Sequence, residues 1–250
     1  MRPLGRDMRV TQAATPKPRA RLIRRERPII ERPRLIKKLD ASEAHSILLV
    51  APAGYGKTTL ARQWARTLSR VVWVSLTTAH RDVAVLARDV ARSLEAFGDA
   101  GFVDFMDQYL QARQSPQREA REIAGVIADS LTRARIQWVV LDDYHELART
   151  VDAEALVETI RAHERTRLLV ASRVRPTWAN GRLSLYGAVT ELGRSDLAMD
   201  KEESALVVGR RDPKVNELVG TAEGWPAILA LAASVDVSEL PPKALPEALH

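Results

Sequence analysis

A short loop followed by a lysine and two threonines carries the clearest chemical signal in the sequence. An apolar run that begins at Ile47 ends in the loop Ala-Pro-Ala-Gly-Tyr-Gly at 51–56, and Lys57-Thr-Thr follows directly. Small residues let backbone N–H groups approach anionic oxygens closely. The start of a following helix would add partial positive charge and free donors. This pattern predicts a cradle for phosphate groups.

The positions of this loop have separate expected roles. Lys57 can reach the β- and γ-phosphates of ATP, and the Thr58 hydroxyl can ligate Mg²⁺. Further nucleotide contacts are expected from the loop and the first helical turn: Pro52, Ala53, Gly54, Tyr55, Gly56 and Thr59. The common motif begins with glycine where this chain has Ala51, and alanine tolerates most backbone conformations except those with φ > 0. The alternative is a chance Gly-Lys-Thr turn before a surface helix.

Two adjacent carboxylates follow a second apolar run. Asp142 and Asp143 come directly after Trp138-Val-Val-Leu. In an open parallel sheet, ligands bind outside the carboxyl ends of the strands, so Asp142 should lie at the edge that carries the phosphate loop. Asp142 is expected to hold Mg²⁺, and Asp143 to polarise a water for attack on the γ-phosphate. A solvated acidic turn is the alternative.

Arg173 closes a further apolar stretch at the same predicted edge. It could sense the γ-phosphate or stabilise charge during phosphoryl transfer, and a plain surface arginine is the alternative. His145, two residues past the acidic pair, could contact water, although a structural role is the better interpretation.

These side chains need a sheet to position them. Apolar runs predict strands at Ser46–Val50, Val71–Ser75, Trp138–Leu141, Arg167–Ala171 and Ala188–Leu192. Apolar periodicity predicts helices at Arg34–Leu39, Lys57–Leu68, Val83–Phe97, Arg118–Arg135 and Asp152–His163, with 98–117 irregular. The alternation predicts an α/β fold, a parallel sheet flanked by helices.

The pattern changes after residue 194. Short helices without strands are expected at Asp200–Val208, Val215–Thr221 and Pro226–Val235. We therefore expect a basic, disordered arm at 1–27, a nucleotide-binding α/β domain at 28–194, a helical lid at 195–235, and a linker or the start of another domain at 236–250.

Composition limits the remaining classes. The chain has no Cys, which excludes disulfides and thiolate metal sites. Its apolar runs are far shorter than the roughly 20 residues of a membrane span, so a cytoplasmic protein is the default. Residues 1–27 carry nine of the 38 Lys and Arg and two of the 32 Asp and Glu, which leaves the rest nearly neutral. That arm could touch nucleic acid, or it could be a solvated tail.

Five segments in order resemble a known family. They are Glu31-Arg-Pro-Arg-Leu-Ile, Leu49-Val-Ala-Pro-Ala-Gly-Tyr-Gly-Lys-Thr-Thr-Leu, Val140-Leu-Asp-Asp-Tyr-His, Leu169-Val-Ala-Ser-Arg and Glu223-Gly-Trp-Pro-Ala. Over roughly 28–235 the set resembles the ATPase region of the MalT-like, LuxR-type bacterial transcription regulators. These belong to the signal-transduction ATPases with numerous domains (STAND), which are relatives of the AAA+ proteins.

The resemblance implies further roles. It implies that Arg32 and Pro33 lie near the adenine, and that Pro226 approaches the nucleotide from the lid. For Pro226, a Pro in the first turn of a helix is the local alternative. It also implies slow ATP hydrolysis, with ADP favouring a closed lid and ATP a self-associating form. The family's winged-helix, repeat and helix-turn-helix domains are not recognisable here, so DNA contact would come from a domain absent from this chain or weakly from the arm.

The leading hypothesis is therefore an ATP/ADP-binding switch, the regulatory region of a transcriptional activator. A stand-alone turnover ATPase, a motor or loader acting on nucleic acid, is the alternative. A non-enzymatic module and a small-molecule kinase fit less well, because the loop and acidic residues are intact and no acceptor motif is present. Both a fragment of a longer regulator and a stand-alone relative fit this length.

Overall fold

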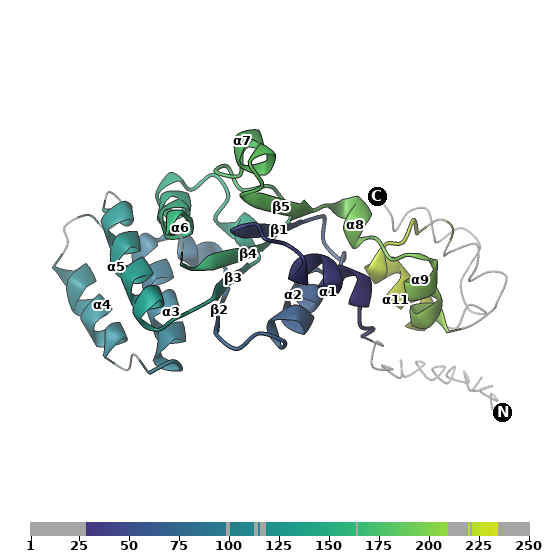
Figure 1. The fold of residues 1–250 in the computed structure, drawn as a ribbon, viewed down its shortest axis with the longest axis horizontal. Helices are drawn as coiled ribbons and strands as arrows, with labels where there is room; N and C mark the ends of the chain where they lie inside the picture. The colour runs from purple at the N-terminus through teal and green to yellow at the C-terminus, as the bar shows by residue number, and fades with distance from the viewer. Residues whose placement is uncertain are drawn as a thin grey trace, which may run out of the picture.

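A five-stranded parallel sheet forms the centre of the molecule (Figure 1). The computed structural model describes residues 29–98, 101–112, 115, 119–163, 165–209, 220 and 222–234. The strands are β1 (Ser46–Val50), β2 (Val71–Ser75), β3 (Trp138–Asp142), β4 (Arg167–Ser172) and β5 (Val189–Leu192), arranged in the order β2-β3-β4-β1-β5. The predicted α/β fold and all five predicted strands are confirmed.

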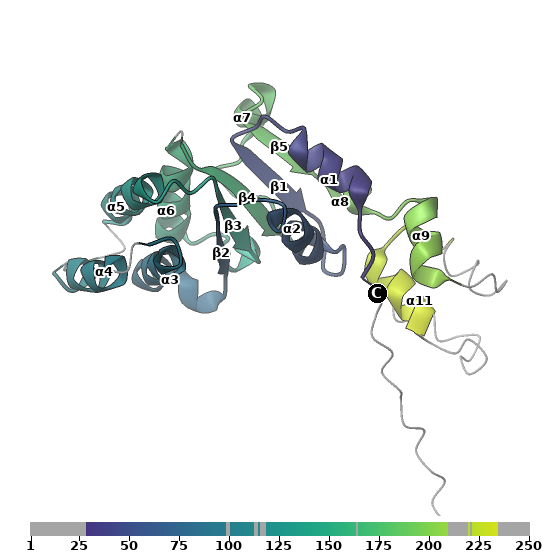
Figure 2. The same ribbon diagram turned by 60° about the horizontal axis from the view of Figure 1, so that its bottom comes forward.

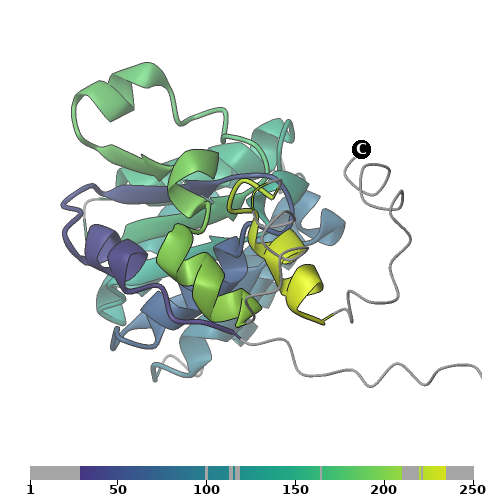
Figure 3. The ribbon, with the colours of Figure 1, turned by 90° about the vertical axis from the view of Figure 1, so that its right-hand side faces the viewer.

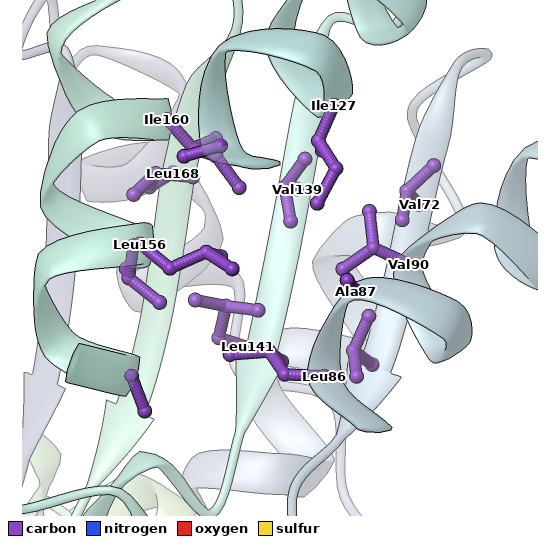
Figure 4. Packing of buried hydrophobic residues seen from close by; sticks show 14 of the residues in the cluster. Val72, Leu86, Ala87, Val90, Ile127, Val139, Leu141, Leu156, Ile160 and Leu168 are labelled. Carbon is purple, nitrogen blue, oxygen red and sulfur yellow. The ribbon is translucent and has the colours of Figure 1, made fainter. Parts of the chain in front are cut away.

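Alternate residues of each strand feed two apolar layers, as the pleat of a buried strand requires. In β1, Leu48 packs on one face, whereas Ile47 and Leu49 pack on the other. Leu48 meets the layer formed by α3 (Val83–Glu95), α4 (Phe102–Gln111), α5 (Ala120–Arg133) and α6 (Val151–Ala162). Figure 4 shows this layer between α3, α5, α6 and the strands. The opposite layer holds α1 (Pro33–Asp40) and α2 (Lys57–Ala65), as Figure 2 shows.

The expectation that 98–117 is irregular was wrong for its first half, because α4 forms there. Phe102, Met106 and Leu110 recur every four residues and are almost fully buried. They pack on the α3 layer, so tertiary contacts support a helix that two nearby glycines and a polar sequence concealed. The remaining residues of that stretch lie mostly outside the described residues.

The short helices α7 (Gly181–Leu185) and α8 (Arg194–Leu197) were also not predicted. Asn180 caps α7, since its side-chain oxygen accepts the Leu183 N–H. In α8, the Asp196 carboxylate accepts the Gly193 N–H across one helical turn. Both helices are too short to show apolar periodicity, so only their caps could have indicated them.

Residues 195–235, which we call the lid, contribute α9 (Lys201–Val208) and α11 (Pro226–Ser234). These helices share a small apolar cluster built around Val207, Val208, Ala222 and Leu229. Viewed from the lid side, α9 in green and α11 in yellow lie across one end of the sheet (Figure 3). The helix predicted at Val215–Thr221 falls outside the described residues except for Gly220, and the arm and the 236–250 segment lie outside them entirely.

Candidate functional site

The loop after β1 turns sharply at two glycines. Gly54 has φ +80° and Gly56 has φ +76°, the left-handed region that favours glycine. Ala51 is not among the four described non-glycine residues with positive φ, and its N–H donates to the Ser172 carbonyl of β4 at 3.3 Å. The first position of this loop therefore does not require glycine, which explains why alanine serves there.

The loop opens directly into the N-terminus of α2. Gly56 is the N-cap and provides no side chain, so the first-turn N–H groups are left for a ligand. Together with the helix dipole, these donors make an anion site. Pro52, Ala53, Gly54 and Thr59 lie exposed around this N-terminus.

Lys57 lies across the inside of the loop. Its Nζ donates to the carbonyls of Ala51 at 2.7 Å and Pro52 at 2.8 Å, and the residue is only 8% exposed. Burial, reinforced by the charge of Arg173, lowers the pKa of Lys57 from its ordinary value, while Asp143 and Asp142 act in the opposite direction. A buried ammonium held near several open donors is placed to meet a polyphosphate.

The two predicted metal ligands meet. Thr58 Oγ1 donates to Asp142 Oδ1 at 2.9 Å, and Asp142 is 3% exposed. Burial raises the pKa of Asp142, with the hydrogen bond from Thr58 partly opposing it. A hydroxyl and a buried carboxylate beside a phosphate loop are the protein ligands that Mg²⁺ takes when phosphates supply others, so these residues fit that ion.

Asp143 differs sharply from its neighbour. Its backbone is left-handed with φ +55°, and its side chain is 51% exposed. The turn directs this carboxylate away from the strand, while its N–H donates to Asp142 Oδ1 at 3.1 Å. Of these two neighbours in sequence, the Asp142 carboxylate is thus buried and the Asp143 carboxylate is open to water.

His145 lies within reach of this carboxylate. Its Nδ1 is 3.9 Å from Asp143 Oδ1 and, among the described residues, is buried without a hydrogen-bond partner. Burial lowers the pKa of His145, and the charge of Arg173 adds to that effect. The imidazole therefore favours its neutral form beside Asp143. The sequence alone did not indicate this proximity.

Arg173 follows β4, and β4 lies between β1 and β3. This order places Arg173 between the phosphate loop and the acidic strand end. Its charge lowers the pKa of both Lys57 and His145, and its side chain is exposed. The strand order therefore brings the four predicted catalytic residues together at the carboxyl-terminal ends of the parallel strands. These residues are Lys57, Asp142, Asp143 and Arg173.

The residues implied by family resemblance lie on the lid side. Arg32 is 4% exposed and donates to the carbonyls of Leu197 at 2.9 Å and Ala198 at 3.0 Å. Its Nη2 also pairs with Glu203 at 2.7 Å. Arg32 thus anchors α1 to the lid, a role that the sequence did not suggest. Pro33 is exposed at the first position of α1, and Pro226 is buried at the first position of α11.

Comparisons with known proteins show what this chain is similar to. A family profile described as "AAA domain" matches residues 39–173, from the end of α1 through Arg173. The chain is 28% identical over 213 residues to the HTH-type transcriptional regulator MalT of Vibrio campbellii, covering 82% of this chain and 23% of the relative. It is also 28% identical to MalT of Serratia proteamaculans, over 222 residues. The chain spans about a quarter of these relatives' length.

One solved structure shares the fold. It is a STAND protein with a tetratricopeptide repeat sensor from Pyrococcus horikoshii, with a TM-score of 0.53 and 18% identity. The match covers 85% of this chain and 30% of the other. The family profile and the MalT relatives confirm the resemblance to MalT-like regulators that the motifs indicated, and the solved structure shows that the fold is shared.

Proposed function

Because this chain belongs to the AAA domain family, we propose that it is the nucleotide-binding switch region of a bacterial transcription regulator, which binds ATP and ADP with Mg²⁺ and hydrolyses ATP slowly. The observation that carries this proposal is the hydrogen bond between Thr58 and Asp142, found together with the buried Lys57 ammonium at the open N-terminus of α2. The similarity to MalT regulators supports the regulatory part.

Each residue keeps its predicted role in this proposal. Loop amides and Lys57 hold the phosphates, Thr58 and Asp142 hold Mg²⁺, Asp143 orients the attacking water, and Arg173 senses the γ-phosphate. Pro226 approaches the nucleotide from the lid, and Pro33 lies near the adenine. Arg32 belongs to that same end of the site, and its guanidinium is bonded to Leu197 and Glu203 of the lid.

The proposed units are the arm at 1–27, the α/β domain at 28–194, the lid at 195–235 and the linker at 236–250. Nucleotide identity would shift the lid between closed and open forms, because a ligand moves such an equilibrium by its differential affinity for the two states. The open form would self-associate, and DNA would be bound by a part of the regulator outside this chain. Such a regulator works in the cytoplasm, and no helix among the described residues has the length and apolar character to cross a bilayer.

Nucleotide titration of the purified chain tests the site. We expect wild type to bind ADP in the presence of Mg²⁺, and Lys57→Ala to remove measurable binding while leaving the circular dichroism spectrum unchanged. Lys37→Ala is the matched control, since that lysine is exposed in the last turn of α1. Equal affinity of Lys57→Ala and wild type for ADP would show that the site assignment is wrong.

Steady-state phosphate release separates the switch from a stand-alone motor or loader, which only the basic arm of the sequence favours. A switch turns over slowly whether or not DNA or RNA is present. A motor is stimulated by nucleic acid, and deletion of 1–27 would remove that stimulation if the arm makes the contact.

A further inference from the structure

The lid contacts the phosphate loop through two hydrogen bonds to consecutive carbonyls. The indole N–H of Trp225 donates to the Ala53 carbonyl at 3.2 Å. The backbone N–H of Ala227, in the first turn of α11, donates to the Gly54 carbonyl at 3.1 Å. Both donors come from the lid, and both acceptors lie in the segment that should surround phosphate.

These bonds also fix the orientation of the N–H groups that follow the two carbonyls. In a trans peptide unit the C=O and the following N–H point in opposite directions, and the described chain has no cis peptide. A lid donor on the Ala53 carbonyl therefore turns the Gly54 N–H away from the lid. A donor on the Gly54 carbonyl does the same for the Tyr55 N–H. Amides turned away from the outer face of the loop are directed to its phosphate side.

Glycine at position 54 permits this close approach. A Cβ on Gly54 would lie 2.6 Å from the Ala227 Cβ and 2.8 Å from Trp225 Nε1. Neither contact is tolerated by a real side chain, and φ +80° adds strain for any other residue. Gly54 therefore serves the lid contact as well as the loop turn.

Tyr55 holds the indole in place. Its ring is stacked on Trp225, with ring centroids 5.7 Å apart and planes 18° from parallel. The Tyr55 hydroxyl accepts a hydrogen bond of 2.7 Å from Arg194 Nε, and Arg194 also pairs with Glu223 at 3.3 Å. The side chain of Tyr55 thus faces the lid, while its amide belongs to the phosphate loop.

We propose that Trp225 is a positioning residue of the nucleotide site: with Ala227, it holds the outer carbonyls of the loop so that the amides of Gly54 and Tyr55 are oriented for phosphate. This inference rests on the proposed nucleotide binding and assigns the lid a direct part in it. Coupling of two equilibria is reciprocal, so a seated lid raises nucleotide affinity and bound nucleotide holds the lid seated.

Replacing Trp225 by phenylalanine tests the proposal, because phenylalanine keeps the stack on Tyr55 and loses the indole N–H. Loss of one such hydrogen bond should weaken ADP binding about fivefold. Trp73→Phe is the matched control, because its indole donates within β2, to Ser75 Oγ at 3.0 Å, and not to the phosphate loop. That variant should bind ADP as wild type does.

Hydrogen exchange on the wild-type chain provides the reciprocal test. ADP with Mg²⁺ should slow exchange in peptides covering 222–234, and in Trp225→Phe this lid protection should shrink while protection of 51–60 persists. Equal ADP affinities of Trp225→Phe and wild type would overturn the proposal, as would unchanged exchange at 222–234 on wild type. The wild-type measurement decides the matter even if Trp225→Phe does not fold. Failure of wild type to bind ADP would instead remove the proposed function itself.

Discussion

Thr58 and Asp142 are joined by a 2.9 Å hydrogen bond although they lie 84 positions apart in the chain. Thr58 stands in the first turn of α2, and Asp142 is the last residue of β3, two strands away from β1. The bond therefore spans β4 and closes one side of the site. It also places a hydroxyl and a carboxylate where a single cation can meet both.

Asp142→Asn should stabilise the fold while impairing Mg²⁺-dependent nucleotide binding. Burial raises the pKa of Asp142, so the folded state holds its proton more tightly than the unfolded state. Stability linked to this group is then lost as pH rises from 3.8 through the raised pKa, and the penalty persists at pH 7. Asparagine carries no charge and can still accept the Thr58 hydroxyl.

Thermal melts at several pH values measure this effect. The melting temperature of Asp142→Asn should exceed that of wild type at pH 7, and the difference should vanish once the wild-type carboxyl is protonated. Glu43→Gln, an exposed carboxylate before β1, is the control and should show no such difference. A less stable Asp142→Asn at pH 7 contradicts the argument.

His145 should act on hydrolysis through Asp143. Its Nδ1 has no hydrogen-bond partner among the residues that the structure describes, and it needs to move by about 1 Å to donate to the Asp143 carboxylate, given their separation of 3.9 Å. His145→Asn places an amide nitrogen near the position of Nδ1, whereas His145→Gln places it near Nε2. We expect Asn to retain most of the ATPase rate and Gln to lose it, with the Kd for ADP nearly unchanged in both.

Asp143→Asn is the reference for that comparison. Loss of a general base lowers the hydrolysis rate by roughly 100-fold or more, and binding should weaken far less. Single-turnover ATP hydrolysis and ADP titration on the same preparations separate the two quantities. Equal rates for the Asn and Gln variants of His145 would assign the histidine to packing alone.

The buried ion pair between α1 and the lid should matter for stability. Burial raises the pKa of Glu203, but hydrogen bonds from Arg32 and Arg34 outweigh it and lower the pKa overall. Glu203→Gln leaves the 4% exposed Arg32 without its countercharge, which should cost about 3 kcal/mol. Denaturant unfolding measures the loss.

Lys38→Ala is its control, because Lys38 joins α1 to α8 through an exposed pair with Asp196 at 2.8 Å. Exposed pairs contribute under about 1 kcal/mol. Similar losses for Glu203→Gln and Lys38→Ala would mean that the buried pair does not hold the lid. Loss of adenine-nucleotide affinity without loss of stability in Arg32→Ala would instead favour the adenine contact implied by the family.

Gly224→Ala should loosen the lid. Gly224 has φ +74°, and an added Cβ would lie 2.4 Å from the Met199 carbonyl oxygen. That oxygen belongs to backbone, so the Gly224 segment must shift, which moves the adjacent Trp225 from the phosphate loop. We expect weaker ADP binding and faster hydrogen exchange at 222–234.

Gly125→Ala is the opposite control. Gly125 lies within α5, and an added Cβ meets nothing within 4 Å. Alanine there should stabilise the protein by about 0.5–1 kcal/mol because it is the better helix former. If Gly224→Ala bound ADP and exchanged hydrogen as Gly125→Ala does, the tight packing of the Gly224 turn would not position the lid.

The strands and the acidic edge could be predicted because each rests on a local signal. An apolar run indicates β3, and the carboxylates at its end indicate the ligand edge. The sequence could not predict the lid contacts made by the side chains of Tyr55, Arg32 and Trp225, because these contacts join segments that are distant in sequence. Helix α4 was not predicted for the same reason, because packing on α3 stabilises it.

The position of β1 in the sheet has a consequence for synthesis on the ribosome. Leu49 of β1 lies beside Ala171 of β4 and Leu192 of β5, so the first of the five described strands to be translated is flanked by strands translated much later. Until they emerge, the nascent chain carries an apolar strand with two unpaired edges. The phosphate loop that follows β1 therefore gains both of its neighbouring strands only after β5 has been translated.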